Sequence, residues 1–473
     1  MAYSWWRSRD PQARIGESLC ESRPTWRERT HRLHGRIDRS TPSGYPRLSV
    51  RVRRVAHRIL SIDAAAAVFF VLVVDYPNTI KLGANSVAAV ITIALTFILA
   101  LLLAMNLIAA NGRISDRSRW AVWEGFIGVP PALVLFAVYA LVRLAAGVTS
   151  EGIQNTLCYV MFVFSILVSA SSLQFDYRRV IRLMAVAAVI SSIAFIVQQI
   201  IYGGTGRFPF LGDRSYAMSA LIGLAVLIPA KPSGIDPHSP PRSLIFPLLV
   251  ASALILSLSR TAIAVAMVLV LFFAVRVRKS LRTPTVAVII VVSFSLLVAI
   301  VSVYPPILAR FTEGDNTQIG GVTMNTSGRV ELWEVTFSSA MRAPVWGHGP
   351  GDSAALLHRT ISGSGIGHPH SDYLRILNDL GFVGSILLWG GLLIVLSRCW
   401  RSALRADDTR HWAAVMAILS VLLVAITDNV IVYQFVMIPV GVLVGISLRS
   451  TPAPIPILEW RWSPRPSSLM SSD

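Results

Sequence analysis

The sequence has few charged residues and very little cysteine. Asp, Glu, Lys and Arg make up 14% of the 473 residues, whereas about 25% is usual in a soluble globular protein. Only three cysteines are present, and none lies between residues 304 and 380, the longest hydrophilic stretch. We therefore expect no disulfide framework and no cysteine-based metal site in that stretch. The shortage of charge argues against an ordinary soluble protein.

Long apolar runs stand in place of the missing charge. Hydrophobic residues make up 54% of the chain and the mean hydropathy is +0.61. A helix needs about 20 apolar residues to cross a bilayer, and several runs approach or exceed this length. The sequence predicts an all-α polytopic membrane protein with about twelve transmembrane helices. The predicted spans are 60–76, 86–110, 125–146, 153–173, 183–202, 215–230, 243–258, 261–275, 284–303, 381–397, 411–427 and 430–448.

The short pair 243–258 and 261–275 has an alternative interpretation as one long helix. That helix would place Arg260 at the centre of the bilayer, where an arginine costs at least ~2.5 kcal/mol. A turn at Ser259-Arg260 on the outer face avoids this cost. We therefore predict two helices.

Basic residues fix the predicted orientation. With the N-terminus inside, the five internal cytoplasmic loops hold 16 Lys or Arg, and the short outer loops hold four. Cytoplasmic loops are the basic ones in membrane proteins, so both termini are predicted to be cytoplasmic. The resulting division is an Arg-rich cytoplasmic tail (1–59), transmembrane helices 1–9 (60–303), a large outer loop (304–380), transmembrane helices 10–12 (381–448) and a cytoplasmic tail (449–473).

The net charge of +18 comes largely from the N-terminal tail. Its first 59 residues contain 14 arginines and five acidic residues, and the first apolar stretch begins only near Leu60. Such a tail is most simply explained by contact with anionic lipid headgroups. Nucleic-acid binding is the alternative, but no recognisable binding module accompanies the arginines, so we expect no nucleic-acid partner.

The predicted outer loop contains two stretches with the apolar spacing of an amphipathic helix. Loops of this length are usually functional. The second stretch runs directly into the span that begins at residue 381. The stretches are Val330, Trp333, Phe337 and Met341, and then Tyr373, Leu377 and Leu380.

Four arginines on the predicted outer side lie near membrane level, and the distribution of basic residues disfavours arginines on that side. They are Arg207, Arg214, Arg260 and Arg329. The planar guanidinium group is the preferred partner of phosphate oxygens. Headgroup contact or a surface ion pair would explain any single arginine, but the set predicts a binding site for an anionic, lipid-linked group.

His370 is the candidate proton acceptor. It precedes Ser371, a good N-cap, and the second predicted amphipathic helix. A neutral imidazole can act as a general base, although a loop histidine can also serve only as a hydrogen-bond partner. A metal site that joins His368 and His370 is a further alternative, but the sequence has no HExxH or Cys-His spacing, and no metal is expected.

The motifs together resemble the O-antigen ligase and O-antigen polymerase superfamily of bacterial envelope enzymes. The resemblance covers about residues 180–400. The first motif is His370-Ser371, followed after nine residues by Gly381-Phe-Val-Gly384, and the second is Ser259-Arg260-Thr261 between two short spans. The third is Gly328-Arg329 with Trp333, Pro344 and Gly347-His-Gly349-Pro-Gly351. The fourth is Arg207-Phe-Pro-Phe-Leu211.

The resemblance implies a GT-C-like glycosyltransferase in the bacterial cytoplasmic (inner) membrane, with its active site on the outer face and no metal or other cofactor. Its donor would be a glycan on undecaprenyl diphosphate, and its acceptor a glycan or a lipid-anchored sugar hydroxyl. His370 would be the general base, and Arg207 or Arg214, with Arg260 and Arg329, would bind the diphosphate. Ser371, Gly381 and Gly384 would be structural. Membrane lipids and envelope polysaccharide assembly proteins are the other implied partners.

Two other functional classes stay open, as does the choice between ligase and polymerase. A transporter or flippase of lipid-linked saccharides would favour two similar halves, and no convincing internal repeat is visible. A non-catalytic scaffold for envelope assembly would explain the tail and the loop but not the combination of histidine and arginines.

Overall fold

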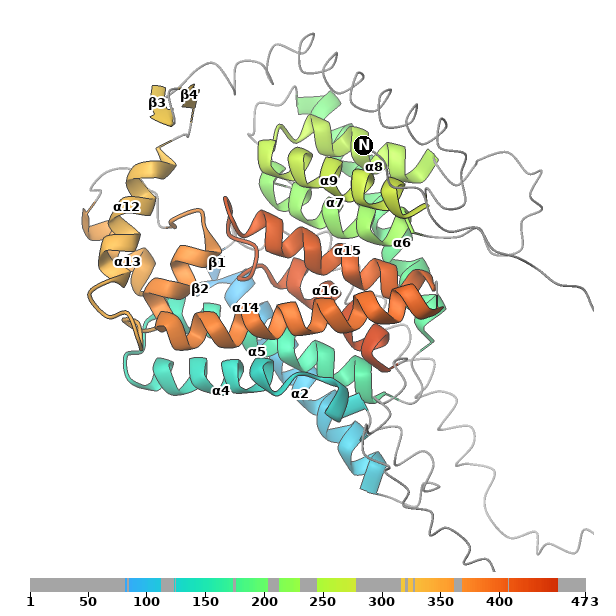
Figure 1. Cartoon of the computed structure of the whole chain (residues 1–473), viewed down its shortest axis with the longest axis horizontal. Helices are drawn as coiled ribbons and strands as arrows, with labels where there is room; N and C mark the ends of the chain where they lie inside the picture. The colour runs from blue at the N-terminus through green and yellow to red at the C-terminus, as the bar shows by residue number, and fades with distance from the viewer. Residues whose placement is uncertain are drawn as a thin grey trace, which may run out of the picture. The chain divides into compact units, whose positions relative to one another are not determined.

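The computed structural model describes twelve segments of the chain (Figure 1). All of them belong to one compact unit, Ile59–Asp473. The described residues are 81–82, 85–111, 123, 125–172, 176–202, 212–229, 245–277, 316–319, 322–325, 328–360, 368–406 and 408–449.

Helices make up almost all of the described structure. Ten apolar helices overlap ten of the predicted spans, and two further helices lie in the predicted outer loop. The predicted spans 60–76 and 284–303 and the N-terminal tail lie outside the described residues. The helices are α2 (Val87–Asn111), α4 (Pro131–Ala145), α5 (Ser150–Ser171), α6 (Tyr177–Tyr202), α7 (Asp213–Leu227), α8 (Ile245–Leu256), α9 (Arg260–Val277), α12 (Arg329–Ala340), α13 (Asp352–Thr360), α14 (Asp372–Ala406), α15 (Thr409–Val424) and α16 (Gln434–Arg449).

The helices have the composition of a membrane protein. Among the described residues, α5, α6 and α14 are long and apolar enough to cross a bilayer, and six shorter helices are equally apolar. Large apolar side chains such as Leu135, Val142 and Ile386 are more than half exposed, which is the normal condition of a surface that faces lipid rather than water. The chain is a helical integral membrane protein. The count of twelve spans and the GT-C-like arrangement stay predictions.

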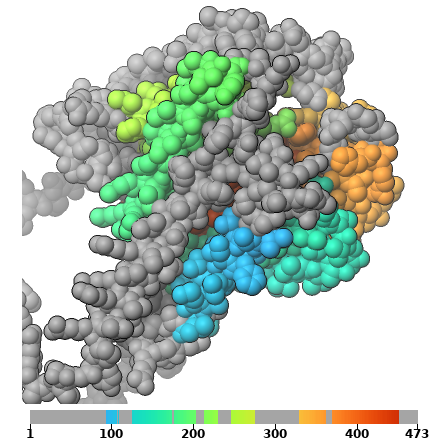
Figure 2. All heavy atoms as spheres, turned by 180° about the vertical axis from the view of Figure 1, so that it is seen from behind, coloured from blue at the N-terminus to red at the C-terminus, as the bar shows by residue number. Residues whose placement is uncertain are grey.

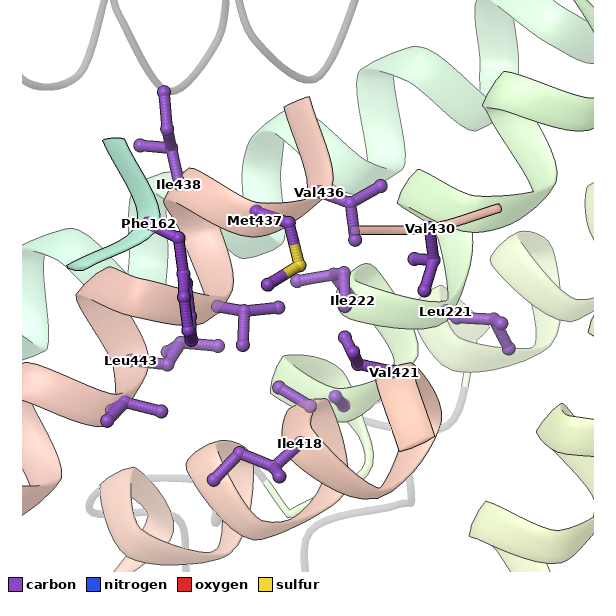
Figure 3. Packing of buried hydrophobic residues seen from close by; sticks show 14 of the residues in the cluster. Phe162, Leu221, Ile222, Ile418, Val421, Val430, Val436, Met437, Ile438 and Leu443 are labelled. Atoms are coloured by element: carbon purple, nitrogen blue, oxygen red, sulfur yellow. The ribbon is translucent and has the colours of Figure 1, made fainter. Parts of the chain in front are cut away.

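The core forms where α16 packs against α5. Two glycines of α16 lie directly on the α5 backbone: a Cβ on Gly441 would lie 1.9 Å from the Ser165 hydroxyl, and one on Gly445 would lie 2.5 Å from the Ile166 carbonyl oxygen. Small residues allow helices to approach this closely in membranes. The buried cluster around this contact also takes in α7 and α15, as Figure 3 shows with Phe162 among side chains of the other three helices.

The predicted turn between the short helices is confirmed. Helix α8 ends at Leu256 and α9 begins at Arg260. Leu258 adopts the left-handed conformation, with φ 56°, which costs a non-glycine residue roughly 1–2 kcal/mol. This sharp reversal places Arg260 at the first residue of a helix instead of inside one.

Four short strands, which the sequence did not predict, accompany the helices. Strand β1 (Lys81–Leu82) pairs with β2 (Asn85–Ser86), and β3 (Asn316–Ile319) pairs with β4 (Val322–Asn325), both antiparallel. The second hairpin lies in the predicted outer loop, where a Gly-Gly pair separates the two strands in the sequence. Such a pair favours a tight hairpin turn.

Helix α14 contains a break that ties the outer segment to the membrane helices. Gly381 has φ 65° and ψ −167° inside an otherwise continuous helix. The amides of Phe382 and Val383 therefore donate to the carbonyls of Pro344 and Val345, at 2.7 and 3.2 Å. The second predicted amphipathic helix does run into the span, as expected, but with this kink between them.

We predict that Gly381→Ala destabilises the protein by about 1–3 kcal/mol, the usual cost of a strained backbone position. A Cβ at residue 381 would lie 2.3 Å from the Val345 carbonyl oxygen. Thermal unfolding of the purified protein in detergent should show a clearly lower Tm. The matched control is Gly390→Ala in the same helix, where a Cβ meets nothing within 4 Å. A Tm for Gly381→Ala equal to that of the control would contradict the assignment.

Candidate functional site

His370 stands immediately before α14 in a strained conformation. Its φ is 51°, and the amide of Arg375 donates to the carbonyl of Ser371, at 3.0 Å, so the helix starts where the sequence predicted. Strained non-glycine residues occur preferentially at functional sites. The imidazole is 17% exposed, which leaves it accessible to a substrate while the backbone fixes its direction.

Asp428 is the centre around which the candidate residues gather. It lies in the turn between α15 and α16 and is 2% exposed. Its Oδ1 lies 3.6 Å from Nδ1 of His370, and its Oδ2 lies 3.8 Å from Nε of Arg214. Nη1 of Arg214 also lies 3.4 Å from Nδ1 of His370. One buried carboxylate therefore faces both the candidate base and a candidate diphosphate ligand.

Three of the four predicted arginines lie at helix starts around this carboxylate. Arg214 is the second residue of α7, and Arg260 and Arg329 are the first residues of α9 and α12. A positive side chain at a helix N-terminus is unfavourable for the helix, so this repeated placement points to a role in binding an anion.

The turn that carries Asp428 also contacts the other two arginine-bearing helices. Nη1 of Arg329 donates to the carbonyl of Thr427, at 2.8 Å. The hydroxyl of Thr261, next to Arg260 in the sequence, lies 2.8 Å from the hydroxyl of Thr427. The starts of α9 and α12 are thus held against the turn.

Two pKa shifts outside the membrane helices report this concentration of charge. Burial lowers the pKa of Arg329, and the nearby positive charges of Arg214 and Arg260 lower it further, against the opposing effect of Asp428. Burial alone would raise the pKa of the Asp428 carboxyl, but its contacts with His370 and Arg214 outweigh burial and leave it below its ordinary value. Asp428 is therefore ionised at neutral pH and stays so well into the acid range.

Asp372 fixes the turn relative to His370. Its Oδ2 accepts hydrogen bonds from the amides of Val430 and Ile431, at 2.6 and 2.9 Å, and its own amide donates to the carbonyl of Ala425, at 2.9 Å. Oδ1 of the same carboxylate forms an ion pair with Arg375, and both side chains are fully buried. The first turn of α14 thus holds both ends of the segment that carries Asp428.

The second turn of α14 holds the glycine-rich loop, residues 347–351, through a second buried carboxylate. Asp379 accepts hydrogen bonds from the amides of Gly351 and Ser353, at 2.9 and 2.8 Å, at the start of α13. The amide of Gly349 donates to the carbonyl of Asp379, at 2.8 Å. A Cβ on Gly347 would lie 2.5 Å from that same carbonyl oxygen, and one on Gly351 would lie 2.6 Å from the amide nitrogen of Gly152, so both glycines are needed for close backbone contact.

His368 and His370 have different partners. Nδ1 of His368 lies 3.3 Å from Oε1 of Glu151, whereas His370 faces Asp428. Burial, followed by the positive charge of Arg375, lowers the pKa of His368 to about 4, so it is neutral and a weak base at pH 7. In the part of the chain that the structure describes, no three His, Cys, Asp or Glu side chains cluster as metal ligands would.

Residues 245–389 match the family model described as O-antigen ligase. This segment is similar to the O-antigen ligase family. The matched segment, called the ligase domain below, begins with α8 and ends within α14, and it contains Arg260, Arg329 and His370. The match indicates a membrane enzyme with glycosyltransferase-type activity and confirms the superfamily resemblance. Comparison of the chain with curated proteins gave no match.

The ligase domain is completed by segments on either side of it. Arg214 comes from α7, before the domain, and Asp428 comes from the turn after it. The other predicted diphosphate ligand of the N-terminal half, Arg207, lies outside the described residues, so its role stays a prediction. Among the structural predictions, Ser371 directly precedes α14 and Gly381 forms the break. A Cβ on Gly384 would lie 2.3 Å from that of Leu380.

Sequence reasoning missed the acidic residues of the site. Asp428 falls in the predicted two-residue outer turn between the spans 411–427 and 430–448, and it was not predicted as a site residue. A single acidic residue between two apolar spans is a signal that could have identified it. Asp372, Arg375 and Asp379 recur at i, i+3 and i+7, which places them on one helix face. All three are fully buried, which the sequence did not show.

We predict that Arg375→Met destabilises the protein by about 3–5 kcal/mol, because it leaves the buried Asp372 carboxylate without its cation. The double variant Asp372→Asn/Arg375→Met removes both charges and retains a side-chain oxygen for the turn amides. It should therefore lose less stability than Arg375→Met alone in detergent thermal unfolding. A double variant that is less stable than the single one would argue against the ion pair.

Proposed function

We propose that the chain is a glycosyltransferase of the bacterial inner membrane that acts at the outer leaflet. It would move a glycan from undecaprenyl diphosphate to a sugar hydroxyl of a glycan or a lipid-anchored acceptor, as a polysaccharide ligase or polymerase. The observation that carries this proposal is the convergence of His370, Arg214 and Asp428, with Arg260 and Arg329 held against the same turn.

The reaction needs one proton acceptor and one anion site. The acceptor oxygen attacks the anomeric carbon of the donor and forms the new C–O bond, while the bond to the diphosphate breaks and the electron pair leaves with the phosphate oxygen. Nε2 of His370 takes the hydroxyl proton. Because the diphosphate leaves as an anion, no general acid is required, and electrostatic stabilisation by fixed positive groups is the main contribution expected.

Asp428 would hold His370 in the form that accepts the proton. An arginine N–H can only donate, so its contact with His370 Nδ1 requires that Nδ1 be unprotonated. The contact with Asp428 requires Nδ1–H and leaves Nε2 free as the base. A bound diphosphate would attract Arg214, which is half exposed, and leave Nδ1–H to Asp428. Donor binding would thus prepare the base.

The arginines supply a site of suitable charge. Arg214, Arg260 and Arg329 carry three positive charges, and the carboxylate of Asp428 acts on both Arg214 and Arg329. The positive charges of Arg214 and Arg260 oppose that of Arg329, and a bound diphosphate would offset this repulsion. Guanidinium groups bind phosphate oxygens through charge-assisted hydrogen bonds.

His370→Ala is expected to abolish transfer while leaving protein in the membrane at the wild-type level. A purified-protein assay with undecaprenyl diphosphate-linked oligosaccharide and an acceptor would measure both the joined glycan and the released undecaprenyl diphosphate. The matched control is His358→Ala, on the exposed side of α13, which should keep normal activity. Wild-type transfer by His370→Ala would refute the role of the base, and movement of intact lipid-linked donor without any release would identify a flippase instead.

Asp428→Asn should lower kcat by roughly 10²–10⁴-fold, the range seen when the carboxylate that orients a catalytic histidine is neutralised. The KM for the lipid-linked donor should change far less, because all three arginines remain. Steady-state kinetics with varied donor concentration separates the two effects. A change confined to KM would make Asp428 a determinant of donor binding and not a positioning residue for His370.

A further inference from the structure

Helix α12 has three distinct faces. The face that packs on the protein is formed by small or short residues, Leu332, Thr336 and Ser339. The apolar residues whose spacing predicted the helix point elsewhere: Phe337 is 49% exposed and Met341, at its C-cap, is 40% exposed. The apolar stripe of this helix is therefore not part of the protein core.

The third face of α12 is polar. Glu331 and Ser338 are exposed, and at 100° per residue they lie between the apolar stripe and the packed face, whereas the exposed Glu334 borders Met341. The exposed part of α12 therefore has an apolar side, at Phe337, and an acidic side, at Glu331.

The apolar stripe continues into the segment after α12. Val345 and Trp346 are 48% and 59% exposed, and they lie at the break in α14, where Val383 donates to the Val345 carbonyl. Below that break, Phe382 and Ile386 are 48% and 68% exposed on the same spanning helix. The exposed surface of the outer segment therefore joins the lipid-facing surface of α14.

Helix α4 extends the same surface on the other side. The hydroxyl of Tyr139 donates to the carbonyl of Trp346, at 2.9 Å, and the two rings lie 6.5 Å apart. Val138 and Val142 beside it are exposed. Figure 2 shows the teal region that contains α4 directly beside the orange region of α12 and α13. Tyr and Trp are the residues enriched at membrane interfaces, and this pair joins the outer segment to α4.

The direction of α12 fits this position. In Figure 1, α4 and α14 run across the view, and α12 lies beyond their ends, crossing their direction instead of continuing it. A helix that crosses the ends of spanning helices lies near the plane of the membrane surface.

We infer that α12 is an interfacial helix, with Phe337, Met341, Val345 and Trp346 inserted among the acyl chains of the outer leaflet. Lipid is the occupant because the stripe is continuous with the apolar surfaces of α4 and α14, which lipid must cover. This inference depends on the membrane topology and not on the proposed chemistry. It also places Arg329, the first residue of α12, at the level of the lipid headgroups.

The test is spin-label accessibility of the full chain in vesicles of phosphatidylethanolamine and phosphatidylglycerol. Labels at Phe337→Cys and Met341→Cys are compared with Glu331→Cys on the polar face, in a background in which the three native cysteines are replaced by serine. Oxygen partitions into lipid and nickel chelates into water. We expect the ratio of oxygen to nickel collisions to be several-fold higher at 337 and 341 than at 331.

Two outcomes would overturn the inference. High nickel accessibility at residues 337 and 341, equal to that at 331, would place the stripe in water. Low accessibility to both reagents would place it under a partner protein or a second copy. A second measurement needs no cysteine replacement: shallow brominated lipids should quench a smaller share of the tryptophan fluorescence in Trp346→Phe than in the native chain, and an unchanged share would contradict lipid contact.

Discussion

The carboxylate of Asp372 is the constraint on which the site depends. One oxygen holds two amides of the turn after α15, and the other pairs with Arg375 inside the protein. Because His370 stands two residues before Asp372 and Asp428 stands two residues before Val430, this single group fixes the candidate base relative to its carboxylate partner. A buried carboxylate is stable only when its hydrogen-bonding capacity is used, so the turn and the helix start stabilise each other.

The same helix organises the outer segment through its second turn and its break. The carboxylate of Asp379 accepts hydrogen bonds from backbone amides at the start of α13. The break at Gly381 allows the carbonyl of Val345 to accept a hydrogen bond from the α14 backbone. Two motif blocks that are separate in the sequence, the glycine-rich loop and the Gly-x-x-Gly pair, are therefore one structural unit. This unit attaches α12, with Arg329, to a membrane helix, so these glycines contribute to the site through backbone geometry.

Much of this arrangement follows from the sequence, for identifiable reasons. Apolar length predicted the spanning helices, and the cost of an arginine at the bilayer centre predicted the turn before Arg260. The residues that position the site were not predictable in the same way. Asp372 and Asp379 lie on one polar helix face, and the sequence spacing of such a face is the same whether it meets water or is buried in the protein. The apolar stripe of α12 shows the converse: its spacing predicted the helix correctly, but periodicity cannot distinguish a face that meets protein from one that meets lipid.

The central claim is that the arginines and His370 form one site for a lipid-linked diphosphate. Cryo-electron microscopy of the full chain in lipid nanodiscs with bound undecaprenyl diphosphate would test it most directly. The account predicts diphosphate density in contact with Arg214 and Arg260 and within reach of Arg329, with Nε2 of His370 facing the space where the anomeric carbon would lie. Diphosphate bound elsewhere, with His370 still enclosed between Arg214 and Asp428, would contradict it.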